Sequence, residues 1–450
     1  MISTTLGRCR PFAAFLACCL LFVSGRAAAA DEIASPRIAE LRAQLASQSE
    51  AARTSTLEAF WQQAKKSGTP LIEPVAGDEK SMLVTFLWRD AVKDGMSNVA
   101  VKNQFKDGAP VDRLARLEHS DVWYRTYKQN AAGRFTYSLV FPAGSTPHPN
   151  ARRLSLDGVV TEFIADPLAR ANYGEHASFA EGPKAMPEPW RDERSGVPRG
   201  RVEEFRATST ELGNTRDIAV YLPPGYKAGG AYPFVVSSDK ESDAEEKLPQ
   251  LMDNMIADGA IPPMVVIMVS YIDGAHRNAE LPHNPKYTRF IAKELVPLVR
   301  SKYGLTRDPK QAVIRGCSLG GIGSTSVGMA YPEVFGNVLS QSGSYWWTPT
   351  VDRGDRERFY KELGWLPSQF ATGKKLPLKF YLELGSEEGA GLMQANRQFR
   401  DILLARDYDV TYQEHIGMHC SVGARSTFPT GLITLVGTRK GRAMLAEVLK

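Results

Sequence analysis

A glycine-flanked serine within residues 316–321, with the sequence GCSLGG, carries the clearest chemical signal in the chain. Ser318 is the serine of a G-x-S-x-G motif, preceded by the apolar run 312–314 and followed by a helix-compatible segment, 322–330. In this context of strand, sharp turn and helix, the motif raises a serine hydroxyl above the end of a parallel sheet, because glycine tolerates the tight backbone. The sequence therefore predicts Ser318 as the nucleophile of an acyl-transfer reaction; the alternative is a loop serine without a catalytic role.

The base that would activate this serine is expected late in the chain. In the α/β-hydrolase arrangement the order is nucleophile, acid, histidine, and only His415 and His419 come beside or after the last expected strand, 410–414. His415 still belongs to that strand or is leaving it, whereas His419 follows Gly417 in a loop at the sheet edge where Ser318 is expected. We predict His419 as the base, with His415 as the alternative.

The acid of a triad is expected after the strand 379–384. Glu387 and Glu388 lie there, and a carboxylate at this place would hold the histidine tautomer and stabilise the imidazolium that forms when histidine takes the serine proton. We favour Glu388 over Glu387, while both could instead begin the next helix at its positive end.

Donors for a developing oxyanion are expected at two turns. The backbone N–H of Leu319, directly after the nucleophile, is the first. The second is expected in the turn after the strand 234–238, around Asp239 and Lys240, whose side chains could equally contact a substrate.

The elements around these residues alternate between strand and helix patterns. The second domain is predicted to begin with a β-hairpin formed by residues 202–208 and 216–222. The alternating strands and helices after it predict a mostly parallel sheet covered on both faces, the α/β-hydrolase fold. The predicted strands are 234–238, 264–270, 312–317, 338–342, 379–384 and 410–414, and the predicted helices are 248–258, 287–303, 321–330 and 392–405.

The chain of 450 residues is long enough for two folded units, and its 43% hydrophobic content supports two cores. Proline- and charge-rich residues at 181–200 are expected to link them. We therefore predict an N-terminal β-sandwich domain with leading helices over 31–195 and an α/β-hydrolase domain over 200–450. The sandwich strands are indicated by alternating runs at 82–88, 98–102, 122–127 and 135–140, and the helices by residues 38–45 and 55–66.

The first 30 residues have the pattern of a secretory signal peptide, with a basic start at Arg8 and Arg10, an apolar run at 11–23 and three alanines at 28–30. The apolar run is too short to span a membrane. Cys18 and Cys19 raise the alternative of a lipoprotein, although they lie inside the apolar run rather than after it. The mature protein is expected to be periplasmic or secreted, without stable membrane insertion.

The charge and the cysteines narrow the class of protein further. Removal of residues 1–30, which contain three arginines and no acidic residue, lowers the net charge from +5 to +2. The chain has no long block of Lys and Arg, so it does not have the composition of a nucleic-acid-binding protein. Three of the five cysteines leave with this segment, and Cys317 and Cys420 remain in an oxidising compartment.

Motifs in both domains resemble the enterochelin esterases, which hydrolyse the trilactone backbone of catecholate siderophores after iron uptake. In the N-terminal domain the matching residues are 84–90, 120–124, 137–139 and 166–168. In the second domain they are Arg277, 280–281, Asn284, 294–297, 316–321, 342–347, Gly385, Glu388, 395–397, Gly417, His419, Arg425 and 431–432. The resemblance implies a Ser318–His419 catalytic pair with Glu388 as its acid.

The resemblance also implies a substrate, a ferric catecholate siderophore, which is anionic and rich in aromatic rings. Arg277, Arg425 and the aromatic cluster of Tyr345, Trp346 and Trp347 are then the expected contacts, and their alternative role is that of buried aromatics and a surface ion pair. No cofactor and no metal ligand of the protein is implied, because the iron arrives inside the substrate.

The chain departs from the family pattern near the expected pocket. Cys420 and Ala424 stand where the family usually has aspartate and tryptophan, and residues 238–240 read SDK where it tends to have leucine, aspartate and glycine. Two alternatives therefore stay open: an exported esterase for phenolic (feruloyl or tannin-like) or carbohydrate esters, and a ferric-siderophore-binding protein without hydrolysis. Many family members act in the cytoplasm, whereas the signal pattern predicts a periplasmic form that removes iron from its carrier.

The two remaining cysteines flank the catalytic pair. Cys317 precedes Ser318 and Cys420 follows His419, an arrangement similar to tannase-type feruloyl esterases, in which a disulfide joins the two cysteines. If Ser318 and His419 form a hydrogen bond, the Cα atoms of their neighbours can come within disulfide reach, about 4.4–6.8 Å. The resemblance thus implies a Cys317–Cys420 bridge, and the alternative is a pair of small buried thiols.

Overall fold

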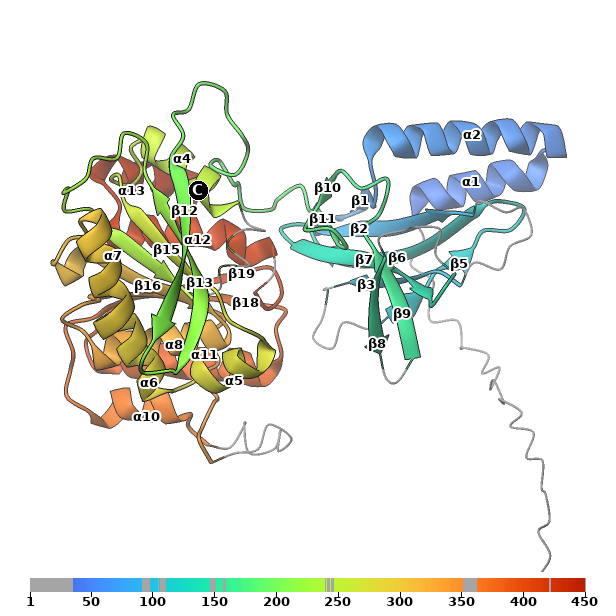
Figure 1. The fold of residues 1–450 in the computed structure, drawn as a ribbon. Coiled ribbons are helices and arrows are strands. Elements are labelled where there is room, and N and C mark those ends of the chain that lie inside the picture. The colour runs from blue at the N-terminus through green and yellow to red at the C-terminus, as the bar shows by residue number, and fades with distance from the viewer. Residues whose placement is uncertain are drawn as a thin grey trace, which may run out of the picture.

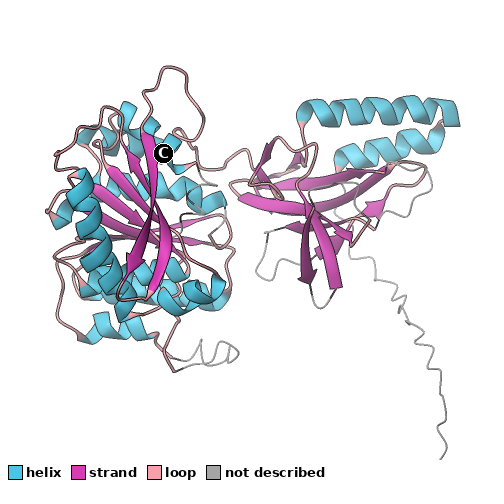
Figure 2. Cartoon of the chain, in the orientation of Figure 1, coloured by secondary structure: helices cyan, strands magenta, loops and turns pink. Residues whose placement is uncertain are grey.

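The computed structural model describes residues 35–90, 98–103, 105, 111–145, 151–156, 159–238, 240, 243, 247–350, 362–420 and 422–449. Within them the chain forms two units side by side, a sheet-rich N-terminal unit and an α/β unit, joined by residues 182–200 (Figures 1 and 2). The predicted signal peptide, residues 1–30, lies outside the described residues.

Two helices, α1 (Pro36–Ser47) and α2 (Glu50–Ser67), lead into the N-terminal unit and lie along its outer side (Figure 1). The Ser35 side chain accepts a hydrogen bond from the Ile38 N–H, and proline stands in the first turn of α1, so this helix has a strong start signal. Ile38, Leu41 and Leu45 form the apolar stripe of α1 that packs with Trp61 against the sheet below.

The N-terminal unit contains two antiparallel sheets that enclose one core. Phe86, Phe105, Phe135 and Tyr137 meet in that core with ring centroids 4.4–5.8 Å apart, so the predicted β-sandwich is confirmed. One sheet has the order β1 (Leu71–Val75), β2 (Asp78–Arg89), β6 (Val122–Asn130), β5 (Ala115–Arg116). The other has the order β10 (Ala171–Asn172), β11 (Ser178–Glu181), β7 (Arg134–Pro142), β3 (Ala100–Asn103), β4 (Val111–Arg113), with β9 (Val159–Ile164) on β7 and β8 (Arg152–Leu156) on β9.

The second unit is built on an eight-stranded sheet. Its order is β12 (Arg201–Ser209), β13 (Asn214–Leu222), β15 (Val265–Val269), β14 (Phe234–Ser237), β16 (Ala312–Cys317), β17 (Asn337–Gln341), β18 (Lys379–Gly385), β19 (Asp409–His415). The strands β12 and β13 form the predicted hairpin and pair antiparallel, whereas the strands from β15 to β19 pair parallel. The carboxyl ends of the parallel strands therefore share one edge of the sheet.

Helices cover both faces of this sheet, which confirms the predicted α/β-hydrolase fold. Alternate residues of each strand point to opposite faces; in β16, Val313 packs on one side and Ile314 on the other. The Val313 side carries α4 (Leu248–Ala257), α12 (Val422–Val436) and α13 (Arg439–Val448). The Ile314 side carries α6 (Pro285–Arg289), α7 (Val296–Tyr303), α8 (Leu319–Ala330), α10 (Trp365–Thr372) and α11 (Ala390–Ala405).

The prediction of a single regular α-helix over 287–303 is wrong. The structure divides it into α6, a π-helical turn at Phe290–Leu295 and α7. Pro297 stands near the start of α7 and has no N–H to donate to the preceding turn, so a regular α-helix cannot continue through it. The helix also begins two residues earlier than predicted, because the Asn284 side chain accepts from the Lys286 N–H and caps it.

Candidate active site

Ser318 occupies the sharp turn between β16 and α8. Its backbone has φ 59° and ψ −118°, a strained conformation for a residue with a side chain, and its N–H donates to the carbonyl of Gln341 on β17 at 2.9 Å. A Cβ atom at Gly316 would lie 2.4 Å from the backbone of Gly320, so only glycine fits there. The motif thus has the strand, turn and helix context that presents a serine hydroxyl at the sheet edge.

His419 is the histidine that the structure brings to this serine. It lies in the loop between β19 and α12, with Nε2 2.8 Å from Ser318 Oγ and Nδ1 2.8 Å from Glu388 Oε2. Its side chain keeps 39% of its surface exposed, as a base that must reach a substrate requires. Ser318, His419 and Glu388 therefore form one continuous hydrogen-bonded chain.

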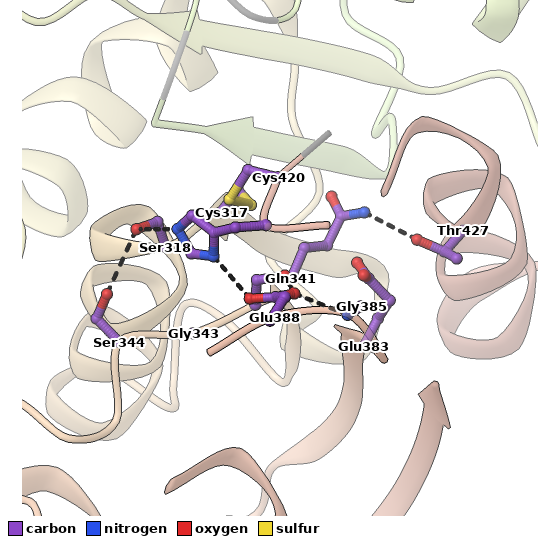
Figure 3. Close-up of a disulfide and its surroundings, with 12 residues drawn as sticks. Cys317, Ser318, Gln341, Gly343, Ser344, Glu383, Gly385, Glu388, Cys420 and Thr427 are labelled. Carbon is purple, nitrogen blue, oxygen red and sulfur yellow. Dashed lines mark hydrogen bonds and ion pairs between the residues drawn. A yellow bond between two sulfur atoms is a disulfide. The ribbon is translucent and has the colours of Figure 1, made fainter. Parts of the chain in front are cut away.

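Glu388 rather than Glu387 completes this chain. The Glu388 side chain is fully buried, and its Oε1 accepts from the Gly385 N–H at 2.7 Å and from the Ser342 hydroxyl at 2.5 Å. Figure 3 shows Ser318 and Glu388 together at the carboxyl ends of the strands. Glu387 is exposed, and its N–H donates to the Gly417 carbonyl at 3.0 Å. Both oxygens of Glu388 are thus occupied, which holds the carboxylate against the histidine ring.

The hydrogen positions follow from the chemistry of these three groups. An ionised carboxylate only accepts hydrogen bonds, so His419 Nδ1 carries a hydrogen and donates it to Glu388. Neutral imidazole has one N–H, so Nε2 accepts, and Ser318 donates its hydroxyl hydrogen to it. This is the arrangement in which histidine can remove the serine proton.

A disulfide joins Cys317 to Cys420, with Cα atoms 6.0 Å apart (Figure 3). The bridge links the end of β16 to the histidine loop across a sequence separation of 103 residues. The two alternatives for these cysteines are therefore resolved in favour of the bridge in this structure. Cys420 has a positive φ of 43°, so the loop turns sharply just after the base.

His415, the alternative base, ends β19 and pairs with Glu383 on the neighbouring strand β18. Its Nδ1 lies 3.0 Å from Glu383 Oε1, and both side chains are buried. Burial lowers the pKa of His415, but the neighbouring Glu383 carboxylate outweighs it, and the net effect is a raised pKa. A Cβ atom at Gly417 would lie 2.8 Å from His415 Nε2, so the histidine loop passes directly over this ring.

The predicted oxyanion donors have different surroundings. Leu319 is the first residue of α8, and the first N–H groups of a helix have no acceptor inside the helix, so its N–H is available beside Ser318. Lys240 lies just beyond β14, and its Nζ is 2.8 Å from Glu204 Oε1 on β12. The ammonium group of Lys240 is therefore paired with the outer hairpin; Asp239 lies outside the described residues.

Arg277 lies beside the nucleophile turn. It belongs to α5 (Gly274–Glu280), its Nη2 is 3.4 Å from the Cys317 carbonyl oxygen, and its guanidinium carbon is 5.9 Å from the ring centroid of Tyr271. A cation is thus held within one residue of Ser318, where it can meet an anionic substrate.

The predicted aromatic contacts separate into two groups. Tyr345 is completely buried, and its hydroxyl bonds to Thr325 in the core at 2.8 Å. Trp346 and Trp347 are only partly buried. The ring centroid of Trp347 lies 6.5 Å from that of His283, which stacks on Trp365 at 3.6 Å, and burial lowers the pKa of His283. The two tryptophans remain candidates for substrate contact, whereas Tyr345 is a core residue.

Arg425 requires a correction, because the structure gives it a protein partner. It lies on α12, is 8% exposed, and places Nε and Nη2 3.0 and 3.1 Å from the two carboxylate oxygens of Glu188 in the linker. Glu188 also lies 3.1 Å from Arg191 and 3.7 Å from Arg134 on β7. Arg425 therefore connects α12 to the linker and the N-terminal unit, and its charge is satisfied there rather than by a substrate.

Sequence reasoning missed Ser342 and Ser344, the hydroxyls that lie close to the triad. Ser342 donates to Glu388, and Ser344 Oγ lies 3.4 Å from Ser318 Oγ. A positional signal was available, since both residues directly follow β17, whose carboxyl end lies at the same sheet edge as Ser318.

In the described residues, no three or more His, Cys, Asp or Glu side chains are grouped so as to hold a metal ion. None of the helices in this part of the chain combines the length and the apolar character that crossing a bilayer requires.

Comparison with known proteins finds a matching family model for each of the two units. A family model described as "Putative esterase" matches residues 209–428, and one described as "Enterochelin esterase, N-terminal" matches residues 83–191. The chain is 30% identical over 393 residues to an iron(III) enterobactin esterase of Dickeya dadantii (strain 3937), covering 80% of this chain and 89% of the relative. It is 29% identical over 390 residues to an iron(III) salmochelin esterase of Escherichia coli O6:H1, covering 82% and 90%.

A solved structure agrees with these relatives. The enterobactin esterase of Shigella flexneri, crystallised in the presence of enterobactin, has a TM-score of 0.70 and 26% identity, covering 84% of this chain and 97% of that one. The resemblance carried by the sequence motifs is thereby confirmed. The chain belongs to the enterochelin esterase family.

Proposed function

We propose that this esterase hydrolyses the ester bonds of a ferric catecholate siderophore of the enterobactin type, with Ser318 as nucleophile, and so releases the iron. The observation that carries the proposal is the continuous hydrogen-bonded chain from Ser318 through His419 to Glu388, in a protein whose two units both match the family. The relatives named above act on enterobactin and salmochelin according to their names.

Acylation is the first half of the proposed reaction. Ser318 Oγ attacks the ester carbonyl carbon while its proton passes to His419 Nε2, and Glu388 stabilises the imidazolium that results. The carbonyl oxygen becomes an oxyanion, which accepts a hydrogen bond from the Leu319 N–H. The bond from carbon to the leaving alkoxide oxygen then breaks, and His419 gives its proton to that oxygen.

Deacylation repeats these steps with water. His419 Nε2 takes a proton from a water molecule, whose oxygen attacks the acyl carbon, and the bond to Ser318 Oγ breaks. Ser318 Oγ recovers its proton from His419, and the acid product leaves. The same three groups therefore serve both halves, which is why the two 2.8 Å contacts of His419 are needed throughout.

The expected substrate matches the surroundings of the nucleophile in charge and shape. Arg277 supplies a cation beside the Ser318 turn for an anionic iron complex, and Trp346 and Trp347 supply faces for catechol rings. We assign the main electrostatic contact to Arg277 because its Nη2 lies 3.4 Å from the carbonyl oxygen of Cys317, the residue before the nucleophile.

We further propose that the protein acts outside the cytoplasm, in the periplasm or beyond. The support is the signal pattern of residues 1–30 together with the Cys317–Cys420 bridge, since disulfides persist in oxidising compartments. N-terminal sequencing of protein recovered from the periplasm tests this; a start near residue 31 supports export. An intact Met1 on protein confined to the cytoplasm contradicts it.

The first experiment compares substrates with the mature protein. Ferric enterobactin and methyl ferulate are each incubated with the protein, and the products are separated by chromatography. Release of dihydroxybenzoylserine units that is lost in Ser318→Ala and retained in Ser326→Ala supports the proposal. Ser326 is the matched control, because it is a buried serine of α8 whose hydroxyl donates to the Pro282 carbonyl.

Two other outcomes would replace the proposal. Cleavage of methyl ferulate alone would keep Ser318 as nucleophile but change the substrate class to phenolic esters. Tight binding of ferric enterobactin without turnover of either substrate would make the protein a siderophore-binding protein.

A further inference from the structure

A second hydroxyl lies beside the nucleophile. Ser344 Oγ is 3.4 Å from Ser318 Oγ, and the side chains of both residues are shown together in Figure 3. Ser344 lies in the segment after β17 and is only 2% exposed. Among the residues that the structure describes, Ser318 Oγ is the hydrogen-bond partner of this hydroxyl. Buried hydroxyl groups in folded proteins are normally hydrogen-bonded, and Ser318 Oγ is the group that serves this purpose for Ser344. Ser344 is therefore in direct contact with the nucleophile.

The backbone holds Ser344 in this position. Its N–H donates to the Ser318 carbonyl oxygen at 3.0 Å, and its own carbonyl accepts from the Trp347 N–H at 3.0 Å. The segment is therefore attached to the nucleophile turn on one side and to the partly buried Trp347 on the other. The Ser344 backbone therefore cannot move far from Ser318 without breaking these bonds.

The direction of the hydroxyl–hydroxyl bond follows from the other hydrogens of the site. Glu388 accepts, His419 Nδ1 donates to it, and Nε2 accepts the hydrogen of Ser318. Because Ser318 has one hydroxyl hydrogen, it has none left for Ser344. The hydrogen in the Ser344–Ser318 contact must come from Ser344.

We propose that Ser344 is a further catalytic residue, whose hydroxyl donates to Ser318 Oγ and stabilises the negative charge that develops on that oxygen. The charge develops when the Ser318 proton moves to His419, and again in deacylation when Oγ leaves the acyl carbon. The Ser344 hydrogen stays on its own oxygen in every step. The 3.4 Å separation is long in the free enzyme, and it is expected to shorten as Oγ gains charge.

The neighbouring serine shows that this segment serves both ends of the triad. Ser342 donates to Glu388 Oε1, while Ser344, two residues later, contacts Ser318 Oγ. Ser342 has a positive φ of 48°, so the backbone turns between the two and directs their hydroxyls to different members of the triad. Loss of Ser342 would act through the acid, whereas loss of Ser344 acts on the nucleophile itself.

The test uses probes that react with Ser318 and need no siderophore. The mature protein and its Ser344→Ala variant are compared in the hydrolysis of p-nitrophenyl acetate and in the rate of phosphonylation by a fluorophosphonate. We expect both rate constants to fall about tenfold, with KM for the ester unchanged, because a donor to a developing charge is lost. Ser326→Ala, the buried serine of α8, is expected to stay within about twofold of the unchanged protein.

Rates within about twofold in Ser344→Ala for both probes would overturn the proposal, and so would a change confined to KM. If Ser344→Ala does not fold, as judged by circular dichroism, Ser344→Cys replaces it; the thiol has the same shape but is larger and donates only weakly, and a similar loss is expected. The proposal depends on the serine esterase mechanism given above but not on its substrate. A failure to cleave ferric enterobactin would therefore leave these measurements unaffected.

Discussion

The residue before the nucleophile, Cys317, is covalently bonded to the residue after the base, Cys420. The nucleophile turn and the histidine loop are thus held together twice, by the disulfide and by the 2.8 Å contact between Ser318 and His419. This matters because the His419 side chain is 39% exposed and burial alone does not hold it. The bridge restricts the loop while leaving the imidazole open to a substrate.

Removal of the disulfide is expected to weaken both stability and catalysis. In a Cys317→Ala, Cys420→Ala double variant we expect the free energy of unfolding to fall by about 2–5 kcal/mol, since the bridge closes a loop of about 100 residues. We expect kcat for p-nitrophenyl acetate to fall about 10- to 100-fold, because the base is no longer held in line with Ser318. Urea unfolding and steady-state kinetics measure the two effects.

Dithiothreitol provides the control for this prediction. It should reproduce the losses in the unchanged protein and have no further effect on the double variant. Equal kcat values with and without the bridge would show that hydrogen bonds alone hold the histidine loop.

Glu388→Gln is expected to lower kcat by about 1,000- to 10,000-fold. The amide group of glutamine can donate to His419 Nδ1, which would favour the tautomer with hydrogen on Nε2 and leave Ser318 without an acceptor. Glu387→Gln is the matched control: its side chain is exposed, and we expect its activity to stay within about twofold. Steady-state kinetics on both variants measures this, and a larger loss in Glu387→Gln would transfer the acid role to that residue.

Glu188→Gln is expected to destabilise the contact between the two units. It removes the carboxylate that Arg134, Arg191 and Arg425 share, and it takes from the buried Arg425 guanidinium the carboxylate that it pairs with. We expect a loss of about 3 kcal/mol in urea unfolding. Glu181→Gln, which changes a half-exposed partner of Arg134, should cost less than about 1 kcal/mol. Similar effects of the two variants would mean that the Glu188 cluster does not stabilise the interface.

The buried pair of His415 and Glu383 makes stability depend on pH. The pKa of His415 is raised above its ordinary value of 6.5, so the folded protein holds this proton more tightly than the unfolded chain. Its contribution to stability is therefore complete below the ordinary pKa and is lost as the pH rises through the raised one. The other charges facing this ring are Glu388, which also raises its pKa, and Arg134, which lowers it.

Urea unfolding at a series of pH values from about 5 to 9 measures this effect. We expect the difference in unfolding free energy between the unchanged protein and His415→Gln to shrink as the pH rises. A difference that stays constant over this range would show that folding does not change the pKa of His415, and a difference that grows with pH would show that folding lowers it; either result contradicts the prediction.

The sequence by itself pointed to the fold and to a short set of candidates for the site. The motif at Ser318 needs only local information, since its glycines, strand and helix are contiguous, and the same is true of the alternating strands and helices. The order of elements then restricted the base to His415 or His419 and placed Glu387 and Glu388 at the right sheet edge. Pro297, which divides the helix that begins at residue 285, is also a local signal in the sequence.

Only the tertiary structure decided between neighbours and found distant partners. Glu387 and Glu388 are adjacent and of the same residue type, yet Glu387 is exposed and Glu388 is buried. The direction of the backbone after β18 determines which of the two side chains points into the protein. Arg425 pairs with Glu188, 237 positions earlier, and Ser344 reaches Ser318 only because β16 and β17 lie side by side. Such contacts depend on how strands and units pack against one another, and no local pattern of residue types records that packing.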